Sequence, residues 1–305
     1  MAALPVVKLG TGRTATAIAA GNEHTCAILD DSSVKCWGMN QRGQLGIDSN
    51  INVGDGPGEM AQLTGINLGT GRTATAIASG DVHTCAVLDD GSVKCWGRNN
   101  YGQLGIGNTD DTGNASGEMA QLTGINLGTG RTATATAAGD VHTCAVLDDG
   151  SVKCWGRNSY GQLGLGDTNS RGDGSNEMGD NLPVVDLGTG RTATAIAAGQ
   201  YHTCALLDNA SVKCWGFNFS GQLGIDSSNH MGDNSGEMAA SPVVKLGTGH
   251  TATAIAARYR HTCAILDDSS VKCWGENNRG QLGIDSTTDT GRASGQMDSL
   301  LGIDL

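Results

Sequence analysis

The chain has 305 residues, of which 48 are glycine and only four are proline, and its formal net charge at pH 7 is -12. General affinity for nucleic acid comes from lysine and arginine that neutralise phosphates, so this charge argues against nucleic acid as a partner. No apolar run is long enough to cross a bilayer, which argues against a membrane span.

A fifteen-residue segment recurs along the chain and begins at His24, His83, His142, His202 and His261. Its first copy reads His-Thr-Cys-Ala-Ile-Leu-Asp-Asp-Ser-Ser-Val-Lys-Cys-Trp-Gly, residues 24–38. Successive copies begin 59 or 60 residues apart. This nearly constant spacing is typical of structural repeats that stack into one continuous body. We therefore predict a single repeat domain over residues 1–305, with repeat cores near 14–46, 73–105, 132–164, 192–224 and 251–283.

Each repeat begins with a short apolar segment that we expect to form an edge strand, first at residues 5–10. Equivalent segments occur at residues 65–68, 124–127, 183–187, 242–246 and 301–305. A Gly-Thr-Gly-Arg turn follows, and then an alternating Thr-Ala-Thr-Ala-Ile-Ala segment that predicts a second strand with small side chains. Five repeats need only five edge strands, so one is surplus. We expect residues 302–305 to complete the fifth repeat through a short local connection.

The recurring segment predicts a β-hairpin, because apolar residues alternate on both sides of a turn such as Asp89-Asp90-Gly91-Ser92. With Gly91 in the left-handed conformation, Leu88 lies opposite Ser92 and Cys85 lies opposite Cys95. Val87 is expected to face Val93 only on the diagonal. The hairpin supplies the third and fourth strands of a repeat.

The ten cysteines form five pairs with the same spacing: Cys26 and Cys36, Cys85 and Cys95, Cys144 and Cys154, Cys204 and Cys214, Cys263 and Cys273. Cross-strand disulfides, reduced buried thiols and metal sites are the three interpretations. Metal sites are disfavoured, because zinc ligands usually stand two to four residues apart. Disulfides are favoured, and they place the protein in an oxidising compartment, extracellular or periplasmic. The start, Met-Ala-Ala-Leu-Pro, shows no signal peptide.

Three motifs in each repeat resemble the regulator of chromosome condensation repeat family. They are Ala-Gly-x-x-His, the Leu-x-Asp-Gly hairpin and Trp-Gly-x-Asn-x-x-Gly-Gln-Leu-Gly, and the resemblance covers the whole chain. It implies an all-β fold, a β-propeller of four-stranded antiparallel blades around a central channel. Family members commonly have seven repeats, whereas this chain has five. The expected molecule is a closed, five-bladed monomer.

The recurring residues do not predict catalysis. A catalytic centre needs one constellation of different groups, whereas the five histidines occupy equivalent places around a ring. We expect their ring nitrogens to bond blade or loop backbone, and the five tryptophans to pack between blades. Phosphate-binding and nucleophile motifs are absent from the sequence. We therefore expect no enzyme, no catalytic residue and no cofactor.

Acidic loops offer the one candidate metal site. Asp48 with Asp55, Asp167 with Asp173, and Asp226 with Asp233 supply oxygen ligands of the kind that calcium prefers. Copies two and five break the pattern with Asn114 and Arg292, so solvated loops are favoured and no metal is expected.

Two short places vary between otherwise near-identical copies, namely the pair before each His and the residues after each Trp-Gly. All four tyrosines, both phenylalanines and six of the twelve arginines of the chain fall there. These types are enriched at interface hot spots, whereas drift in loops brings in Ser, Asn, Lys and Gly. The predicted partner-binding residues are Asn22, Glu23, Arg42, Asp81, Arg98, Tyr101, Asp140, Arg157, Tyr160, Gln200, Tyr201, Phe217, Phe219, Arg258, Tyr259, Arg260, Glu276 and Arg279.

Our main hypothesis is a non-enzymatic scaffold that presents these loops on one propeller face to a protein partner. The alternative is a carbohydrate-binding propeller, because tyrosine, arginine and aspartate also stack on and bond to sugars. Guanine-nucleotide exchange, an activity known in the family that the chain resembles, ranks last. No residue here matches an exchange site, and the chain has no evident basic tail.

Overall fold

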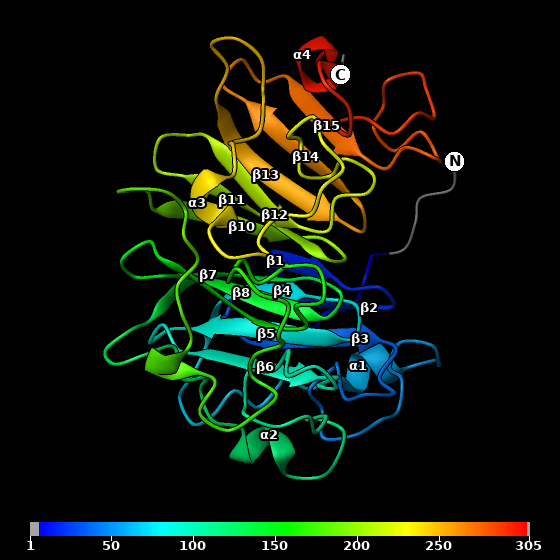
Figure 1. Cartoon of the computed structure of the whole chain (residues 1–305). Coiled ribbons are helices and arrows are strands. Elements are labelled where there is room, and N and C mark those ends of the chain that lie inside the picture. The colour runs from blue at the N-terminus through cyan, green and yellow to red at the C-terminus, as the bar shows by residue number, and fades with distance from the viewer. Residues whose placement is uncertain (1–5, 304–305) are drawn as a thin grey trace.

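The computed structural model describes residues 6–303 and shows five antiparallel sheets of three strands each (Figure 1). The sheets are β1-β2-β3 (Ala15–Ala20, His24–Leu29, Val34–Gly38), β4-β5-β6 (Ala74–Ser79, His83–Leu88, Val93–Gly97), β7-β8-β9 (Ala133–Ala138, His142–Leu147, Val152–Gly156), β10-β11-β12 (Ala193–Ala198, His202–Leu207, Val212–Gly216) and β13-β14-β15 (Ala252–Arg258, His261–Leu266, Val271–Gly275). Each sheet is one blade of the propeller-like arrangement, numbered one to five along the chain.

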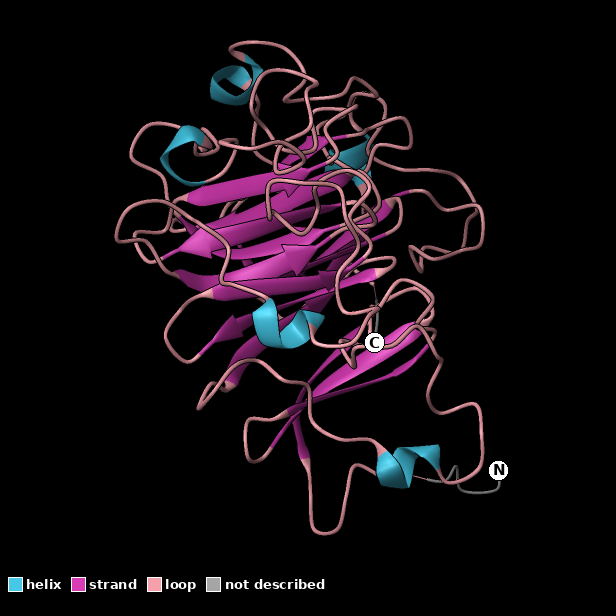
Figure 2. Cartoon of the chain, turned by 90° about the horizontal axis from the view of Figure 1, so that it is seen from below, coloured by secondary structure: helices cyan, strands magenta, loops and turns pink. Residues whose placement is uncertain are grey.

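Short helical turns lie outside the sheets, in the long segments that follow each blade (Figure 2). They are α1 (Glu59–Gln62), α2 (Glu118–Gln121), the 3-10 turn η1 (Gly179–Asn181), α3 (Glu237–Ala240) and α4 (Gln296–Ser299). Within residues 6–303, no helix has the length and apolar character needed to cross a membrane.

The alternating Thr-Ala segment forms a strand, as expected, but it is the first strand of each blade and not the second. In the second blade the pairing of β4 with β5 slips between Ala74 and Ala76, so Thr75 sits in a bulge. The Thr75 hydroxyl donates to the carbonyl of Val87 at 3.2 Å, which satisfies a backbone acceptor at this irregularity. Threonine therefore serves the bulge, and the alanines let neighbouring blades approach closely.

The hairpin of the second blade confirms the expected turn. Gly91 has φ of 75°, the amide of Leu88 donates to the carbonyl of Ser92 at 2.8 Å, and Cys85 lies opposite Cys95. The structure contains the expected disulfides in all five hairpins: Cys26–Cys36, Cys85–Cys95, Cys144–Cys154, Cys204–Cys214 and Cys263–Cys273. The diagonal placement of Val87 and Val93 is wrong, because the register that opposes the cysteines also places these valines directly opposite each other.

A pair of matched substitutions tests how much the left-handed turn residue matters. Ala210 holds the position of Gly91 in the fourth blade with φ of 62°. A Cβ on Gly91 would lie 2.6 Å from Thr132 Cβ, so Gly91→Ala adds both left-handed strain and a close contact. We expect Gly91→Ala to lower the free energy of unfolding by about 1–2 kcal/mol, and Ala210→Gly to raise it by up to about 1 kcal/mol.

Urea unfolding followed by circular dichroism measures both changes. Equal stability of the wild type and Gly91→Ala would show that backbone conformation does not select glycine at this turn.

The expected edge strand, the first of the four predicted for each repeat, is not a strand in any described blade. The outer edge of β3 carries one bridge at each end, from Gly38 to Val53 and from the carbonyl of Val34 to the amide of Ile66 at 2.9 Å. The other blades repeat this pattern, and Ile303 bonds the carbonyl of Val271 at 2.8 Å in the fifth. Between these two bridges the chain runs away from the edge of β3 as a long loop. Each apolar segment therefore pairs with its blade through only one residue.

That contact places the segment ending at Ile303 on the fifth blade, as expected, although residues 304–305 lie outside the described part. Residues 1–5 also lie outside it, and Val6 is exposed.

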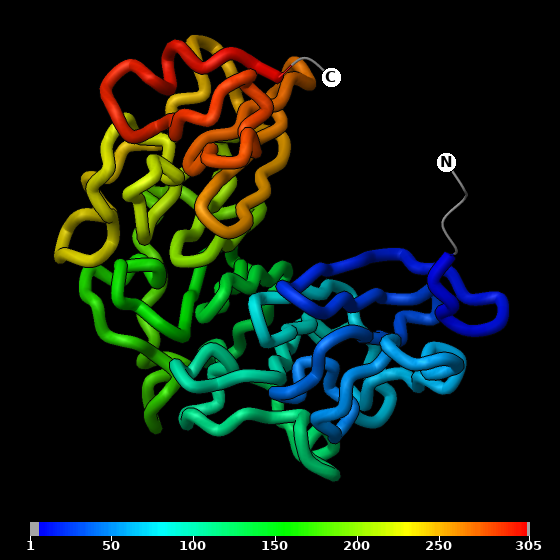
Figure 3. The backbone as a smooth tube through the Cα atoms, turned by 90° about the vertical axis from the view of Figure 1, so that its right-hand side faces the viewer, coloured from blue at the N-terminus to red at the C-terminus, as the bar shows by residue number. Residues whose placement is uncertain are grey.

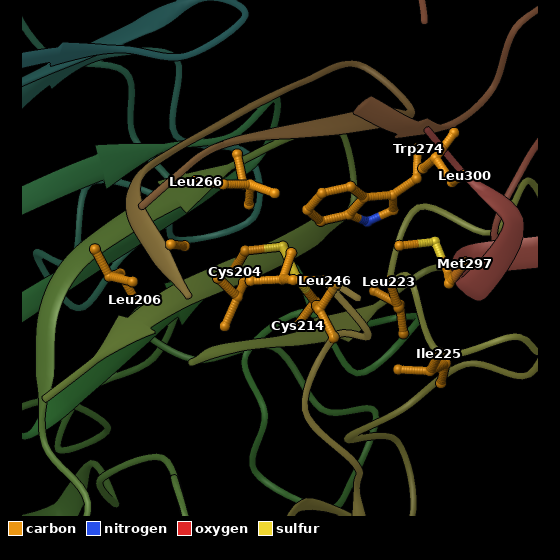
Figure 4. Packing of buried hydrophobic residues seen from close by; sticks show 14 residues of the cluster. Cys204, Leu206, Cys214, Leu223, Ile225, Leu246, Leu266, Trp274, Met297 and Leu300 are labelled. Carbon is orange, nitrogen blue, oxygen red and sulfur yellow. A yellow bond between two sulfur atoms is a disulfide. The ribbon is translucent and has the colours of Figure 1, made fainter. Parts of the chain in front are cut away.

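The core lies between blades rather than within them (Figure 4). Between blades four and five, the Trp274 ring packs with Leu223, Met297 and the Cys204–Cys214 bridge. The indole Nε1 of Trp274 donates to the carbonyl of Gln222 in the preceding blade at 3.0 Å. The tryptophans after the first blade are fully buried in this way and confirm the expected packing between blades.

The five blades form an open arc, so the expected closed ring is wrong for residues 6–303 (Figure 3). On the first blade Ile18 is 69% exposed, and on the fifth Ile265 is 44% exposed, although equivalent residues elsewhere are covered by a neighbouring blade. One hydrogen bond joins the two ends, from Arg258 Nη1 to the carbonyl of Ala20 at 3.4 Å. Each blade interface fixes one angular step, and the four steps between five blades do not bring the last blade against the first.

Candidate binding surface

The repeated histidines form a chain of contacts between blades. His83 Nε2 lies 2.9 Å from the hydroxyl of Thr143 in the next blade, and that hydroxyl donates to the carbonyl of Gln103 at 2.8 Å. Because the hydroxyl hydrogen is used on Gln103, the imidazole must donate from Nε2 and is neutral. Complete burial lowers the pKa of His83 to about 3.

The same contact recurs from His24 to Thr84, His142 to Thr203 and His202 to Thr262. Burial lowers the pKa of His142 and His202 to about 3 and that of His24 to about 4. The expected backbone partner is therefore wrong, since a threonine side chain of the following blade takes that place. The histidines hold blades together and lie too far inside to bind a partner.

In each repeat the variable pair before His lies beside the variable residues after Trp-Gly, because a backbone hydrogen bond joins the two segments. The amide of Arg157 donates to the carbonyl of Val141 at 3.0 Å, and that of Phe217 donates to Tyr201 at 2.8 Å. An unvarying residue then fixes the loop, since the Asn158 side chain accepts from the amide of Leu163 and donates to the carbonyl of Asp167. A constant frame thus presents variable side chains.

The structure gathers most of the chain's tyrosine and phenylalanine on blades two to five. The Tyr160 ring centre lies 5.4 Å from that of Tyr201, 5.0 Å from Phe217 and 5.4 Å from His230. The Phe219 ring continues the cluster at 5.1 Å from Phe217 and 4.8 Å from His230. We call the following set the aromatic patch: Tyr101, Tyr160, Tyr201, Phe217, Phe219, His230 and Tyr259.

Phe217 and Phe219 play different parts in the patch. Phe217 is only 6% exposed and forms its floor, whereas Phe219 is 61% exposed and Tyr259 48% exposed. The expectation that both phenylalanines are surface residues is therefore wrong for Phe217, because neighbouring rings cover it. His230 was missed in the sequence, since it lies in the long loop after Gly-Gln-Leu-Gly and the other copies have no histidine there.

Two arginines lie against the rings of the patch. The Cζ atom of Arg157 lies 4.9 Å from the ring centre of Tyr101 and 5.2 Å from that of Tyr201. The Cζ atom of Arg260 lies 5.3 Å from the ring centre of Phe217 and 5.4 Å from that of Tyr259. These distances are within the range of cation–π attraction, so the rings hold both guanidinium groups in place.

The arginines divide into two groups by location. Seven form ion pairs with nearby carboxylates: Arg13, Arg42, Arg72, Arg131, Arg171, Arg191 and Arg292. Within residues 6–303 the other five form none, and all five belong to the predicted binding residues: Arg98, Arg157, Arg258, Arg260 and Arg279. In a chain with net charge -12, the described arginines that form no ion pair therefore all lie in the variable loops.

Asp140 brings a carboxylate to the same loops. Burial, together with the neighbouring Asp81, raises the pKa of Asp140 to about 6, although Arg258 and Arg260 oppose the shift. The Gln200 side chain accepts from Arg260 Nε at 2.9 Å.

The structure does not bring every predicted residue into the patch. Among the residues described, Asn22, Glu23, Arg42, Glu276 and Arg279 have no contact with its rings; Arg42 instead pairs with Asp111 at 3.2 Å. These positions are on the first and fifth blades, at the two ends of the arc.

The acidic loops serve contacts between blades rather than forming a cage for a cation. Asp226 accepts from the amides of Gly295 and Met297 near the start of α4, and Asp48 does the same near α2. One exposed group of three side chains has suitable ligand atoms close together, namely His250, Asp267 and Asp268. His250 takes the place of the arginines that pair with the equivalent aspartates in the other blades, and its Nδ1 lies 3.2 Å from Asp267 Oδ1, so a structural contact at the hairpin turn accounts for it.

Comparisons with known proteins agree with this architecture. A model of the regulator of chromosome condensation (RCC1) repeat matches residues 15–44, 74–103, 133–162, 193–222 and 252–281, and a second model of the repeat matches residues 31–87 and 149–206. The ultraviolet-B receptor UVR8 of Arabidopsis thaliana is 31% identical over 279 residues, which are 89% of this chain and 55% of UVR8. The human probable E3 ubiquitin-protein ligase HERC6 is 28% identical over 271 residues, 89% of this chain and 24% of HERC6.

Solved structures share the fold. Human WBSCR16 superimposes with a TM-score of 0.71 at 21% identity, over 96% of this chain and 68% of that one. Yeast Prp20, solved with Kap60, gives 0.70 at 18% identity, over 96% of this chain and 62% of that one. The chain spans about half or less of the curated relatives named above.

Proposed function

We propose, from the premise that this chain belongs to the regulator of chromosome condensation (RCC1) repeat family, that it is a non-enzymatic scaffold which binds a protein partner through the aromatic patch. The observation that carries the proposal is the concentration of tyrosine, phenylalanine and unpaired arginine on loops whose frame is constant. An oxidising compartment fits the five disulfides of the structure.

The physical argument rests on what the patch offers. Large rings bury much area at little cost in side-chain entropy, and tyrosine and arginine dominate measured interface hot spots. Phe217 supports the more exposed rings from below, so the surface is already ordered before a partner arrives. Yeast Prp20, which shares the fold, was solved with Kap60 and is described as binding Gsp1p and histones, which supports a protein partner for this chain.

Substitution of Tyr160 and Phe219 by alanine is expected to remove partner binding while the protein stays folded. Phe219 is 61% exposed, and exposed side chains usually contribute within about 0.5 kcal/mol. Tyr160 is half-buried among three rings, so its loss is expected to cost about 1–2 kcal/mol. Trp155→Ala, in contrast, is expected to cost about 3–5 kcal/mol as the loss of a fully buried ring. Phe217 is not substituted, because it is buried and its loss would change both stability and partner binding.

The measurement is capture of proteins from the source material by wild type and variants, compared by mass spectrometry. Val184→Ala serves as the matched control, because Val184 is an exposed apolar residue outside the patch. Proteins retained by wild type and by Val184→Ala but lost with Tyr160→Ala/Phe219→Ala support the proposal. An identical set from all three would contradict it.

A carbohydrate-binding propeller remains the second candidate, and the proximity of Asp140 to Tyr201 favours it, since a carboxylate beside a ring suits a sugar. Repeated sugar sites would need equivalent residues in every blade, whereas the patch occupies only blades two to five. Binding of a glycan array at several equivalent sites would favour this candidate. Guanine-nucleotide exchange ranks last, because no residue of the patch is matched to an exchange site.

A further inference from the structure

Each of the two patch arginines is fixed by one hydrogen bond from its Nε atom and by contact of its guanidinium group with two or more aromatic rings. Arg157 Nε donates to the Ser159 hydroxyl at 3.1 Å, and Arg260 Nε donates to the Gln200 side chain at 2.9 Å. Within residues 6–303, the terminal nitrogens of both guanidinium groups have neither a hydrogen-bond partner nor an ion pair. Each group is therefore fixed in orientation with its outer edge unused.

A fixed guanidinium with a free outer edge matches one kind of ligand group closely. Its two terminal NH2 groups form a planar fork that bonds both oxygens of a carboxylate at once. The surrounding rings reduce competition from water and lower the entropy lost on binding. A lysine at the same place would supply the charge without the fork.

A ligand that binds both arginines through two carboxylates must also fit the surface between Arg157 and Arg260. Arg157 lies 5.2 Å from the Tyr201 ring, which lies 6.3 Å from Phe217, which lies 5.3 Å from Arg260. Aromatic rings thus occupy the interval between the two forks. A complementary ligand has two acidic groups with an apolar group between them.

The overall charge argues against a polyanion as that ligand. The chain carries -12, and Asp81 and Asp140 lie in the loops of blades two and three that are equivalent to the loop of Arg260 in blade five. A nucleic acid or sulfated glycan would bring many further negative charges against these carboxylates. A peptide with two carboxylates satisfies both forks without that repulsion.

We propose that Arg157 and Arg260 are paired carboxylate clamps, and that the partner docks through an acidic peptide segment whose two carboxylates flank apolar side chains. The proposal rests on the proposed function, because it names the chemistry of the segment that covers the aromatic patch.

The test uses the whole chain and fluorescein-labelled peptides in which one to four leucines separate two glutamates. Fluorescence anisotropy is measured for wild type, Arg157→Lys and Arg260→Lys, with Arg131→Lys as the matched control. Arg131 pairs with Asp148 and Asp149 at a hairpin turn, outside the patch. Melting temperatures establish that each variant is folded.

We expect at least one peptide spacing to bind, and each patch substitution to weaken it by about ten- to a hundredfold, as the loss of charge-assisted hydrogen bonds implies. Arg131→Lys should bind as wild type does, and replacement of both glutamates by glutamine in the peptide should reduce affinity similarly. The proposal is overturned if no peptide binds at millimolar concentration, if either patch lysine variant binds normally, or if a heparin oligosaccharide or a phosphopeptide binds more tightly.

Partner capture separates this proposal from the broader one. If Tyr160→Ala/Phe219→Ala loses a captured partner while both patch lysine variants keep it, the scaffold function stands and the clamps fail. If none of these variants changes capture, both proposals fail.

Discussion

Reduction of the five disulfides is expected to unfold the protein at room temperature. Each bridge closes a hairpin between cysteines ten residues apart, and a loop of that length corresponds to about 2–3 kcal/mol of stability in the chain-entropy model. Five bridges together amount to on the order of 10 kcal/mol, which equals the whole stability of a typical domain.

Circular dichroism with and without a phosphine reductant measures the effect. Thiol titration of protein denatured without reductant gives the starting state, for which no free thiol is expected. A single-blade variant, Cys85→Val/Cys95→Val, should lose only about one fifth of the total. An unchanged melting temperature after complete reduction, or ten free thiols in protein kept under oxidising conditions, would refute the prediction.

Acidification is expected to have the second largest effect, because four histidines are buried in the neutral form. The pKa is lowered to about 3 for His83, His142 and His202 and to about 4 for His24. Below about pH 6.5 the unfolded chain binds protons at these sites and the folded chain does not. Stability is therefore complete above that pH and falls as the pH decreases toward 4.

Each of these histidines contributes a slope of about 1.4 kcal/mol per pH unit, so four together give on the order of 5 kcal/mol per unit between pH 6 and 4. Asp140 acts in the opposite direction, because its raised pKa of about 6 makes the folded chain bind one proton earlier than the unfolded chain. One carboxyl cannot offset four imidazoles.

Urea unfolding at pH 7.5, 6.0 and 5.0 tests the slope. His142→Gln should reduce it by about a quarter, since glutamine does not titrate, whereas Val184→Ala changes an exposed residue that does not titrate and should leave the slope unchanged. Constant stability from pH 7.5 to 5.0 would show that the histidines are not buried neutral.

Local features of the blade followed from the sequence because they depend on nearby residues. Spacing and alternation sufficed for the hairpin, and the left-handed turn at Gly91 placed Cys85 opposite Cys95. The histidine contacts depend on the next blade, about sixty residues away, so the threonine partner of His83 could not be inferred from its own repeat.

The predictions of a closed ring and of four strands in each blade were wrong for a related reason. Six apolar segments matched one pattern, yet pairing depends on how the loop approaches the outer strand, and Ile66 reaches it with one residue only. The angular step between blades depends on packing of Trp274 and its counterparts, which the repeat pattern does not specify.

The binding surface could be predicted only in part from the sequence. Comparison of the copies found the variable loops and nearly all of the patch, because side-chain type was the signal there. It could not separate buried Phe217 from exposed Phe219, which stand two residues apart, nor include His230, whose loop varies throughout.

The open arc has a consequence for how such a chain changes in length. Every interface uses the same contacts, with a histidine and a glutamine carbonyl on one blade and a threonine and a tryptophan on the next. At the ends, Thr25 and Trp37 on the first blade and His261 and Gln281 on the fifth are only half-buried, and each end holds one half of that interface. Stability in such an array is a sum of nearest-neighbour energies, so each repeat gained adds one interface of a kind already present. Duplication of a single unit can therefore lengthen the array without the invention of any new contact.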